Sequence, residues 1–292
     1  MKILILGSEG FVGHNLISGL SETNEIFSAD LIEKSLHPNY SQLDITNYEN
    51  VEKIVKNVDV VINLAAHSLV SSIEGPRKNA EINIIGLLNI LESCKNNGIK
   101  KIIFTSASSL VGEPQNLKVS ETHLAKPKTA YGITKLASEH YLRLYHELNG
   151  LEYVIFRFFN IYGPFQKNGL IPTLYKKIVN NEPLTVFGKG DQIRDYVFIE
   201  DVVQYFAKAC STNNMNSIFN MGTGQGTTIL EIINIMSDIL NVKPQIDFQP
   251  PRSGEIGNFV SDTTLLQSTF GTIPNTPVRE GLKKTIEWLS NH

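Results

Sequence analysis

The sequence predicts a doubly wound α/β fold, in which a parallel sheet has helices on both faces, followed by a smaller α/β region. Short apolar runs that resemble buried strands alternate with amphipathic helical stretches over the first half of the chain. A glycine-rich segment lies between the first run and the first helix. The strict alternation weakens after Pro164, which predicts a second, smaller region from residue 164 onward.

The composition is that of a globular protein with a large core, because 41% of the 292 residues are hydrophobic and 19% are charged. The net charge of −3 provides no basic field for a nucleic acid. Cys94 and Cys210 are far apart and lack metal-ligand spacing, so we expect two buried thiols and no metal site. No apolar run is long enough for a signal peptide or a membrane span, and we expect a cytoplasmic protein without a membrane partner.

The glycine segment has the order of a dinucleotide-binding motif. Lys2–Leu6 is a short apolar strand, and Gly7, Gly10 and Gly13 follow it with the spacing G-x-x-G-x-x-G. Such glycines allow a sharp turn, close approach of a pyrophosphate, and close packing of helix on sheet. The phosphates would bind free N–H groups at the start of the helix. A tight turn without a ligand is the alternative, but the flanking strand and helix favour a nucleotide.

Acidic and small residues follow the next strands. Asp30 ends the second predicted strand, where a carboxylate can bind the adenosine ribose and would repel a 2′-phosphate. It therefore favours NAD over NADP. A surface aspartate at a strand end is the alternative, but the glycine loop at the expected distance favours the cofactor role. Asp44 could contact adenine or cap the following helix. Ala65 and Ala66 allow close approach of a ligand at a strand end.

The remaining elements follow from hydrophobic periodicity. The predicted strands are Glu25–Ala29, Asp59–Leu64, Lys101–Thr105 and Leu184–Phe187, and the predicted helices are His14–Leu20, Tyr48–Lys56, Glu81–Asn96, Tyr131–Leu148, Thr173–Val179, Ile229–Leu240 and Arg279–Leu289.

Tyr131 and Lys135 are the first candidates for catalysis. They are four residues apart, so they share one face of a predicted helix. A nearby ammonium stabilises a phenolate and lowers its pKa, so such a tyrosine can exchange a proton at neutral pH. Hydride chemistry at an alcohol carbon needs that proton transfer. A solvated Tyr/Lys pair is the alternative reading of the motif by itself.

Several stretches together resemble the extended short-chain dehydrogenase/reductase superfamily, and within it the NAD-dependent sugar epimerase/dehydratase family. The matching stretches run in family order across essentially the whole chain: GSEGFVG (7–13), Asp30, LDI (43–45), VINLAA (61–66), Asn83, FTSASSLVG (104–112), YGITK (131–135), RFFNIYGP (157–164), PLTVFGKGDQIRDYVFIEDV (183–202), NMGTG (220–224) and PPRSGEIG (250–257).

The resemblance implies a Rossmann-like NAD-binding domain and a set of roles within it. Tyr131 would be the catalytic acid/base, and Lys135 would bind the nicotinamide ribose and lower the tyrosine pKa. The residues implied in cofactor binding are Gly7, Gly10, Phe11, Val12, Gly13, Asp30, Asp44, Ile45, Leu64, Ala65, Ala66, Asn83, Tyr131 and Lys135.

The second half of the chain is implied to bind a nucleotide sugar. Arg194 and Arg252 match arginines that hold the diphosphate, and a forked guanidinium suits phosphate oxygens. Leu170 and Phe187 match residues of the nucleobase pocket, and Asn160 matches a substrate-phosphate contact. We expect an NAD-binding domain at 1–163, with 191–220 returning to it, and a mainly substrate-binding domain at 164–292.

One position departs from the family pattern. The family places a catalytic serine or threonine where this chain has Ala107. Ser109 is two residues further on and would project to the same side as Ala107 if the segment were extended. Ser108 would serve if the turn were shifted by one. Either serine is therefore a candidate.

The expected function is that of an NAD-dependent nucleotide-sugar epimerase in carbohydrate metabolism, acting at C4 of a UDP-sugar through a 4-keto intermediate. A reductase, decarboxylase or dehydratase on the same scaffold is the first alternative, although the acidic T-D-E pattern of 4,6-dehydratases is missing. A non-catalytic NAD-binding regulator is the second. The resemblance also implies a homodimer formed by the helices that contain Glu81 and Tyr131.

Overall fold

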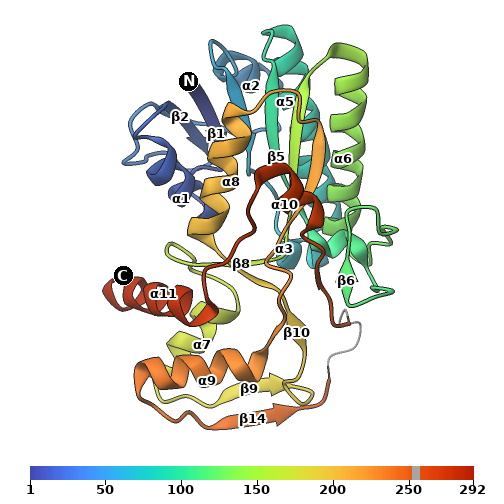
Figure 1. The fold of residues 1–292 in the computed structure, drawn as a ribbon. Helices are drawn as coiled ribbons and strands as arrows, with labels where there is room; N and C mark the ends of the chain where they lie inside the picture. The colour runs from blue at the N-terminus through green and yellow to red at the C-terminus, as the bar shows by residue number, and fades with distance from the viewer. Residues whose placement is uncertain (252–256) are drawn as a thin grey trace. The chain divides into compact units, whose positions relative to one another are not determined.

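The computed structural model describes residues 1–251 and 257–292, which form two compact units. The first unit contains residues 1–112, 123–158 and 203–219, and the second contains 113–122, 159–202 and 220–292. The chain therefore passes between the units several times (Figure 1). The domain boundaries that we expected from the sequence stay a prediction.

A seven-stranded sheet forms the centre of the first unit. The strands are β1 (Lys2–Leu6), β2 (Glu25–Asp30), β3 (Tyr40–Gln42), β4 (Val60–Asn63), β5 (Lys101–Ala107), β7 (Glu152–Phe158) and β12 (Ser217–Met221), in the spatial order β12-β7-β5-β4-β1-β2-β3. The pairs β1·β2, β2·β3, β1·β4, β4·β5 and β5·β7 are all parallel. The strand order reverses beside β1, which is where open sheets of this kind bind ligands. The predicted doubly wound fold is confirmed.

Alternation along each strand sends side chains to two separate layers. Leu4 and Leu6 of β1 belong to a core cluster with residues of α2 (Tyr48–Ile54), α5 (Gly86–Asn96) and α6 (Ala130–Asn149). On α1 (Phe11–Leu20), Gly19 lies against Val203 of α8 (Ile199–Ser211). Figure 1 shows α1 and α8 together on one side of the sheet and α5 and α6 on the other.

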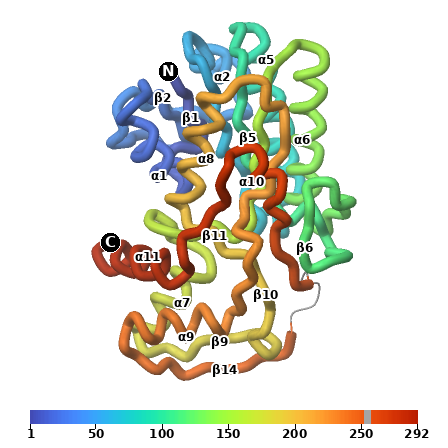
Figure 2. The backbone as a smooth tube through the Cα atoms, in the orientation of Figure 1, coloured from blue at the N-terminus to red at the C-terminus, as the bar shows by residue number. Residues whose placement is uncertain are grey.

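The second unit is built from short strand pairs and helices, as Figure 2 traces. Its paired strands are β10 (Ile193–Arg194) with β13 (Thr227–Thr228), β8 (Asn160–Tyr162) with β11 (Tyr196–Phe198), β9 (Leu184–Phe187) with β14 (Ile246–Gln249), and β6 (Lys118–Val119) with β15 (Val260–Ser261). Its helices are α7 (Leu170–Val179), α9 (Ile229–Leu240), α10 (Thr264–Phe270) and α11 (Val278–Asn291).

One predicted helix is interrupted. The sequence predicted a single helix over Glu81–Asn96, whereas Glu81–Ile85 forms a π-helical turn, η1, before α5 begins at Gly86. A π-turn inserts one residue and so changes the phase of the helix without removing its apolar periodicity. Two further helices, α3 (Leu69–Glu74) and α4 (Pro76–Ala80), precede it and were not predicted. Within the described residues, no helix is long and apolar enough to cross a membrane.

Candidate active site

Two of the three loop glycines are required by the protein itself. Gly7 has φ +81°, and a Cβ there would lie 2.7 Å from the backbone nitrogen of Ala65. Gly13 lies in the first turn of α1, and a Cβ there would come within 2.4 Å of the carbonyl oxygen of Ser8. Gly7 therefore permits the turn off β1, and Gly13 permits close packing of α1 on the loop.

Gly10 has no such internal reason to be glycine. Its φ is −78°, which any residue adopts, and the nearest atom to a Cβ there would be the Gly7 carbonyl oxygen at 3.4 Å. Gly10 is the N-cap of α1, and no side chain of the described residues caps that helix start. The Gly10 N–H donates to the Gly7 carbonyl oxygen at 3.3 Å. The N–H groups of Phe11 and Val12 lie in the first turn of α1, and the positive end of that helix suits a pyrophosphate. The loop fits a dinucleotide.

A cavity of about 330 Å³ lies beside this loop. Asp30 projects from the end of β2, and its carboxylate accepts hydrogen bonds from the backbone N–H groups of Glu9 (2.9 Å) and Leu31 (2.7 Å). The cavity brings together eight of the residues expected to bind the cofactor, namely Gly7, Gly10, Asp30, Asp44, Ile45, Leu64, Ala65 and Ala66.

Asp44 does not cap α2, so that alternative is wrong. Its Oδ1 accepts from the N–H and hydroxyl groups of Thr46, at 2.9 and 2.7 Å, whereas Asn47 is the N-cap. The helix begins three residues later than the cap interpretation required, because Asn47 already accepts from the Asn50 N–H. Asp44 instead lines the cavity, where the adenine contact stays a prediction.

Asn83 lies in the π-turn and is occupied by protein groups. Its Oδ1 accepts from the His67 N–H at 2.7 Å, and its Nδ2 donates to the His67 carbonyl and the Thr134 hydroxyl. These bonds connect the segment after β4 to α6. The geometry gives Asn83 a positioning role, and its expected contact with the cofactor stays a prediction.

Tyr131 and Lys135 lie in the first two turns of α6, which the Thr129 side chain caps through the Gly132 N–H. Lys135 is buried, and its Nζ donates to the Thr105 carbonyl of β5 at 2.7 Å. The same Nζ is 5.5 Å from the centroid of the Tyr131 ring. The helix therefore presents both side chains at the carboxyl end of β5.

The two groups have strongly altered proton affinities. Burial raises the pKa of Tyr131 to about 12, and burial also lowers the pKa of Lys135 to about 7, against an opposing effect of Glu139. Burial alone accounts for the raised pKa of Tyr131, and the expected lowering of this pKa by Lys135 stays a prediction.

The argument from an extended segment at Ala107 is also wrong. The strand β5 ends at Ala107, and Ser108–Val111 forms a 3₁₀ turn, in which alternate residues do not share a side. The turn closes tightly, because Gly112 has φ +70° and a Cβ there would lie 1.9 Å from the Lys126 carbonyl oxygen. Within the described residues, the buried Oγ of Ser109 has no hydrogen-bond partner. Ser109 is therefore a better candidate than Ser108 for a hydroxyl that binds a ligand.

A buried ion pair below these residues was missed by the sequence analysis. Arg157 of β7 contacts Glu139 of α6 through two bonds of 2.9 and 2.7 Å, and Ser106 donates to Glu139 at 2.6 Å. Glu139 follows Lys135 by four residues, which is a signal that it shares the same helix face. The three side chains lock α6 to β5 and β7, and so position Tyr131 and Lys135.

The second unit contains a separate cavity of about 860 Å³. Four residues expected to bind substrate line it: Asn160, Leu170, Phe187 and Arg194. Lys177 contributes a second cation, and the described lining residues include no Asp or Glu. The size lies in the range of small-molecule sites, and the charge suits a polyanion. Arg252, the fifth expected residue, lies outside the described residues.

Asp195 is buried and contacts Asn160, one of the residues that line this cavity. It was not predicted as a site residue. Its buried carboxylate accepts five hydrogen bonds, from the N–H and hydroxyl groups of Thr223 and Ser261 and from the Gly224 N–H. Its carbonyl accepts from the Asn160 backbone and side chain. Asp195 therefore fixes Asn160 and the neighbouring Arg194.

The strand order of the parallel sheet reverses beside β1, next to the glycine loop. This arrangement is that of a dinucleotide-binding α/β protein. The model of the NAD dependent epimerase/dehydratase family matches residues 3–222, so the chain belongs to this family, and NAD is the cofactor. This confirms the resemblance and the cofactor expected from the sequence.

Similar proteins match essentially the whole chain. The crystal structure of UDP-glucose 4-epimerase with UDP-glucose from Thermotoga maritima is 31% identical, with a TM-score of 0.94 over 100% of this chain and 99% of that one. The UDP-glucuronic acid 4-epimerase of Bacillus cereus, in complex with UDP-glucuronic acid and NAD, is 28% identical, with a TM-score of 0.91 over 100% and 99%. UDP-glucose 4-epimerase of Mycolicibacterium smegmatis is 27% identical over 100% of this chain and 99% of its own.

Proposed function

We propose that this protein is an NAD-dependent nucleotide-sugar epimerase that inverts C4 of a UDP-sugar through a transient 4-keto intermediate. The observation that carries the proposal is the cavity of the second unit, which is lined by the cations Arg194 and Lys177 together with Asn160 and the apolar side chains of Leu170 and Phe187. The Tyr131 and Lys135 pair on α6 supplies the proton chemistry. The similar proteins that act on UDP-glucose and UDP-glucuronic acid support the choice of UDP-sugars.

The cavity can bind both parts of a nucleoside diphosphate. Arg194 offers a fork of donors to the phosphates, and its guanidinium is already oriented by hydrogen bonds to the carbonyls of Ile193 (2.8 Å) and Gly257 (3.1 Å). Phe187 and Leu170 provide apolar surface for the base. Asn160, fixed by Asp195, would contact the phosphate next to the sugar.

Tyr131 performs the proton transfer in the proposed reaction. Bound NAD would supply hydride transfer to and from C4 of the sugar. Tyr131 takes the proton of the C4 hydroxyl and later gives it back at the same atom. Lys135, whose Nζ donates to the Thr105 carbonyl, would bind a ribose hydroxyl of the cofactor. The hydroxyl of Ser109 or Ser108 would donate to the C4 oxygen.

The alternatives have weaker support. A reductase or decarboxylase would release or consume the cofactor, and Asp30 at the end of β2 disfavours the 2′-phosphate of NADPH. A dehydratase needs a further acid and base. The T-D-E pattern of 4,6-dehydratases would provide them, and this chain lacks that pattern. A non-catalytic regulator would not need Tyr131 and Lys135 four residues apart on one helix.

Replacing Tyr131 with Phe tests the function directly. The purified protein is incubated with UDP-glucose, UDP-galactose and their N-acetyl forms without added reductant, and products are followed by NMR. The wild type should interconvert one C4 pair, and Tyr131→Phe should lose at least about 10²-fold in kcat while NAD stays bound. Tyr145→Phe, in the same helix, is the matched control and should keep full activity. Turnover by Tyr131→Phe at the wild-type rate would contradict the assignment.

We also propose that the protein is a homodimer. Apolar side chains are exposed on α3, η1 and α6, namely Leu69, Val70, Ile73, Ile85, Ile133, Leu144 and Leu148. Both α3 and η1 contact α6, so these residues belong to neighbouring elements of one unit. A second copy of the chain is the partner that the resemblance implies. The cytoplasmic location stays a prediction from the sequence.

A further inference from the structure

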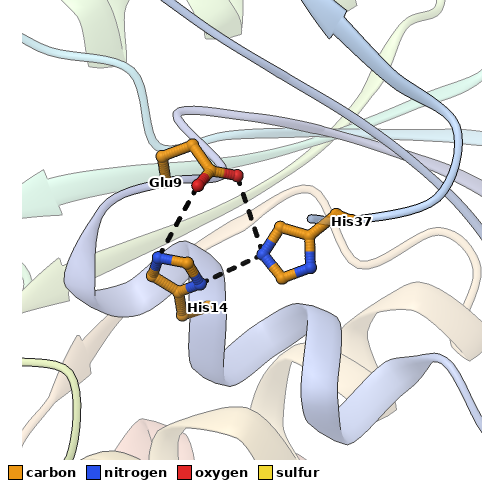
Figure 3. Close-up of side chains that lie close together, drawn as sticks. All are labelled: Glu9, His14 and His37. Carbon is orange, nitrogen blue, oxygen red and sulfur yellow. Dashed lines mark hydrogen bonds and ion pairs between the residues drawn. The ribbon is translucent and has the colours of Figure 1, made fainter. Parts of the chain in front are cut away.

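Three polar side chains converge next to the glycine loop and have no part in the proposed reaction (Figure 3). Glu9 comes from the loop, His14 from the first turns of α1, and His37 from the segment after β2. The His37 Nε2 is 3.6 Å from Glu9 Oε1 and 3.0 Å from His14 Nδ1. The His14 Nε2 is 3.8 Å from Glu9 Oε2. All three residues are half-buried.

Two imidazoles and one carboxylate form a donor set that binds zinc in proteins. Tetrahedral zinc with bonds of about 2.0 Å places its ligand atoms about 3.3 Å apart. An imidazole gives one nitrogen to an ion, and His14 Nδ1 lies 3.0 Å from His37 Nε2, which is 3.6 Å from Glu9 Oε1. With one ligand atom from each residue, the three atoms all lie within 4.8 Å of one another, so rotations of the side chains would bring them to the tetrahedral spacing. A cluster held by hydrogen bonds alone would also bring the groups together, and titration with Zn²⁺ distinguishes it from a metal site.

A neighbouring residue orients two of the three groups. Ser35 Oγ donates to Glu9 Oε1 at 2.7 Å and accepts from the backbone N–H of His37 at 3.0 Å. Outer partners of this kind fix the direction of metal ligands. The carboxylate and the His37 ring are therefore held toward each other by the local backbone as well as by their mutual contact.

We propose that Glu9, His14 and His37 bind one divalent transition-metal ion, with Zn²⁺ as the best match and water completing the coordination. The ion would clamp the segment around His37 to the glycine loop. His14 and His37 are 23 positions apart and form no short motif, so a metal site was not predictable from the sequence. The proposal concerns side chains outside the reaction and does not depend on the proposed function.

The test is metal binding by the full chain. The purified protein is stripped with EDTA, dialysed and titrated with ZnCl₂ by isothermal titration calorimetry. The wild type should take up one ion per chain, and His37→Ala and Glu9→Gln should each bind at least about tenfold more weakly. Co²⁺ bound to the wild type should give the visible absorption of a tetrahedral site, and the two variants should lack it.

Thermal unfolding provides a readout that separates binding from misfolding. Zn²⁺ should raise the melting temperature of the wild type and of His292→Ala, an exposed histidine control, but not that of His37→Ala. If the melting temperature of His37→Ala in EDTA is lower than that of the wild type, Glu9→Gln replaces it in this comparison, because glutamine keeps the size of the side chain. Absence of uptake by the wild type, or equal uptake by the wild type and both variants, would overturn the proposal.

Discussion

At the scale of single residues, Ser109 and Ser108 have different surroundings although they are neighbours in one 3₁₀ turn. The Oγ of Ser109 is buried and has no partner among the described residues, so its loss should leave the free energy of unfolding nearly unchanged. If this hydroxyl serves the substrate, Ser109→Ala should lower kcat about 10²-fold. Ser108→Ala is the matched variant and should stay within a few-fold of wild type. The reverse ranking in NMR assays would assign the role to Ser108.

The buried Lys135 should make stability depend on pH. Its pKa is lowered by burial from 10.5 to about 7, so between these values the unfolded chain holds a proton that the folded protein has released. The free energy of unfolding should therefore rise with pH from 7 upward, by at most about 1.4 kcal/mol per pH unit, and the gain is lost as the pH falls through 7.

Urea unfolding of the protein and of Lys135→Met between pH 7 and 8.5 measures this dependence. The variant should show a smaller rise, since it has no proton to release. Higher pH is avoided because burial raises the pKa of Tyr131 and of Cys94 to about 12, and these groups act in the opposite direction. Equal slopes for the two proteins would show that Lys135 keeps its proton in the folded state.

At the scale of the glycine loop and α1, two glycines should respond differently to the same methyl group. Gly10→Ala should leave the free energy of unfolding unchanged or raise it by up to about 1 kcal/mol, because φ is −78° and the nearest atom to its Cβ lies at 3.4 Å. It should weaken NAD binding at least about tenfold, because the Cβ would meet the pyrophosphate.

Gly13→Ala should instead lower the free energy of unfolding by about 1–3 kcal/mol, since its Cβ would lie 2.4 Å from the Ser8 carbonyl oxygen. Urea unfolding without NAD and calorimetric titration with NAD separate the two effects. A Gly10→Ala protein that binds NAD as tightly as wild type would show that the loop does not hold the pyrophosphate.

The elements were largely predictable because their signals are local. The run Lys2–Leu6, the glycine spacing and the apolar periodicity of Ile229–Leu240 each lie within one segment of the chain, and the structure has both elements with those bounds. The π-turn at Asn83 was not predictable, because one inserted residue changes the phase of a helix but leaves its composition unchanged.

The partners of buried charges were not predictable for a different reason. Glu139 meets Arg157 only because α6 packs beside β7, and Asp195 takes donors from segments 28 and 66 positions away. Local patterns do not contain such pairings. The pKa of Tyr131 belongs to the same group, since it follows from burial that only the folded chain produces.

At the scale of the whole molecule, the exposed apolar surface of α3, η1 and α6 should be covered in solution. Light scattering after size-exclusion chromatography should give the mass of two chains for the wild type. Leu144→Glu should shift the mass toward one chain, because a carboxylate buried at an interface without a partner is costly. Leu36→Glu, fully exposed and outside this surface, should remain dimeric. A monomeric wild type would contradict the homodimer.

The fixed orientation of the Asp30 carboxylate has a consequence for the free energy of cofactor binding. Its two oxygens are already held by the backbone N–H groups of Glu9 and Leu31, so the side chain is confined to one rotamer before any ribose arrives. Immobilising a mobile side chain on binding costs about 0.5–1.5 kcal/mol. Folding has already removed this freedom from Asp30. An adenosine ribose that binds to Asp30, as we propose, would therefore not incur this entropic cost.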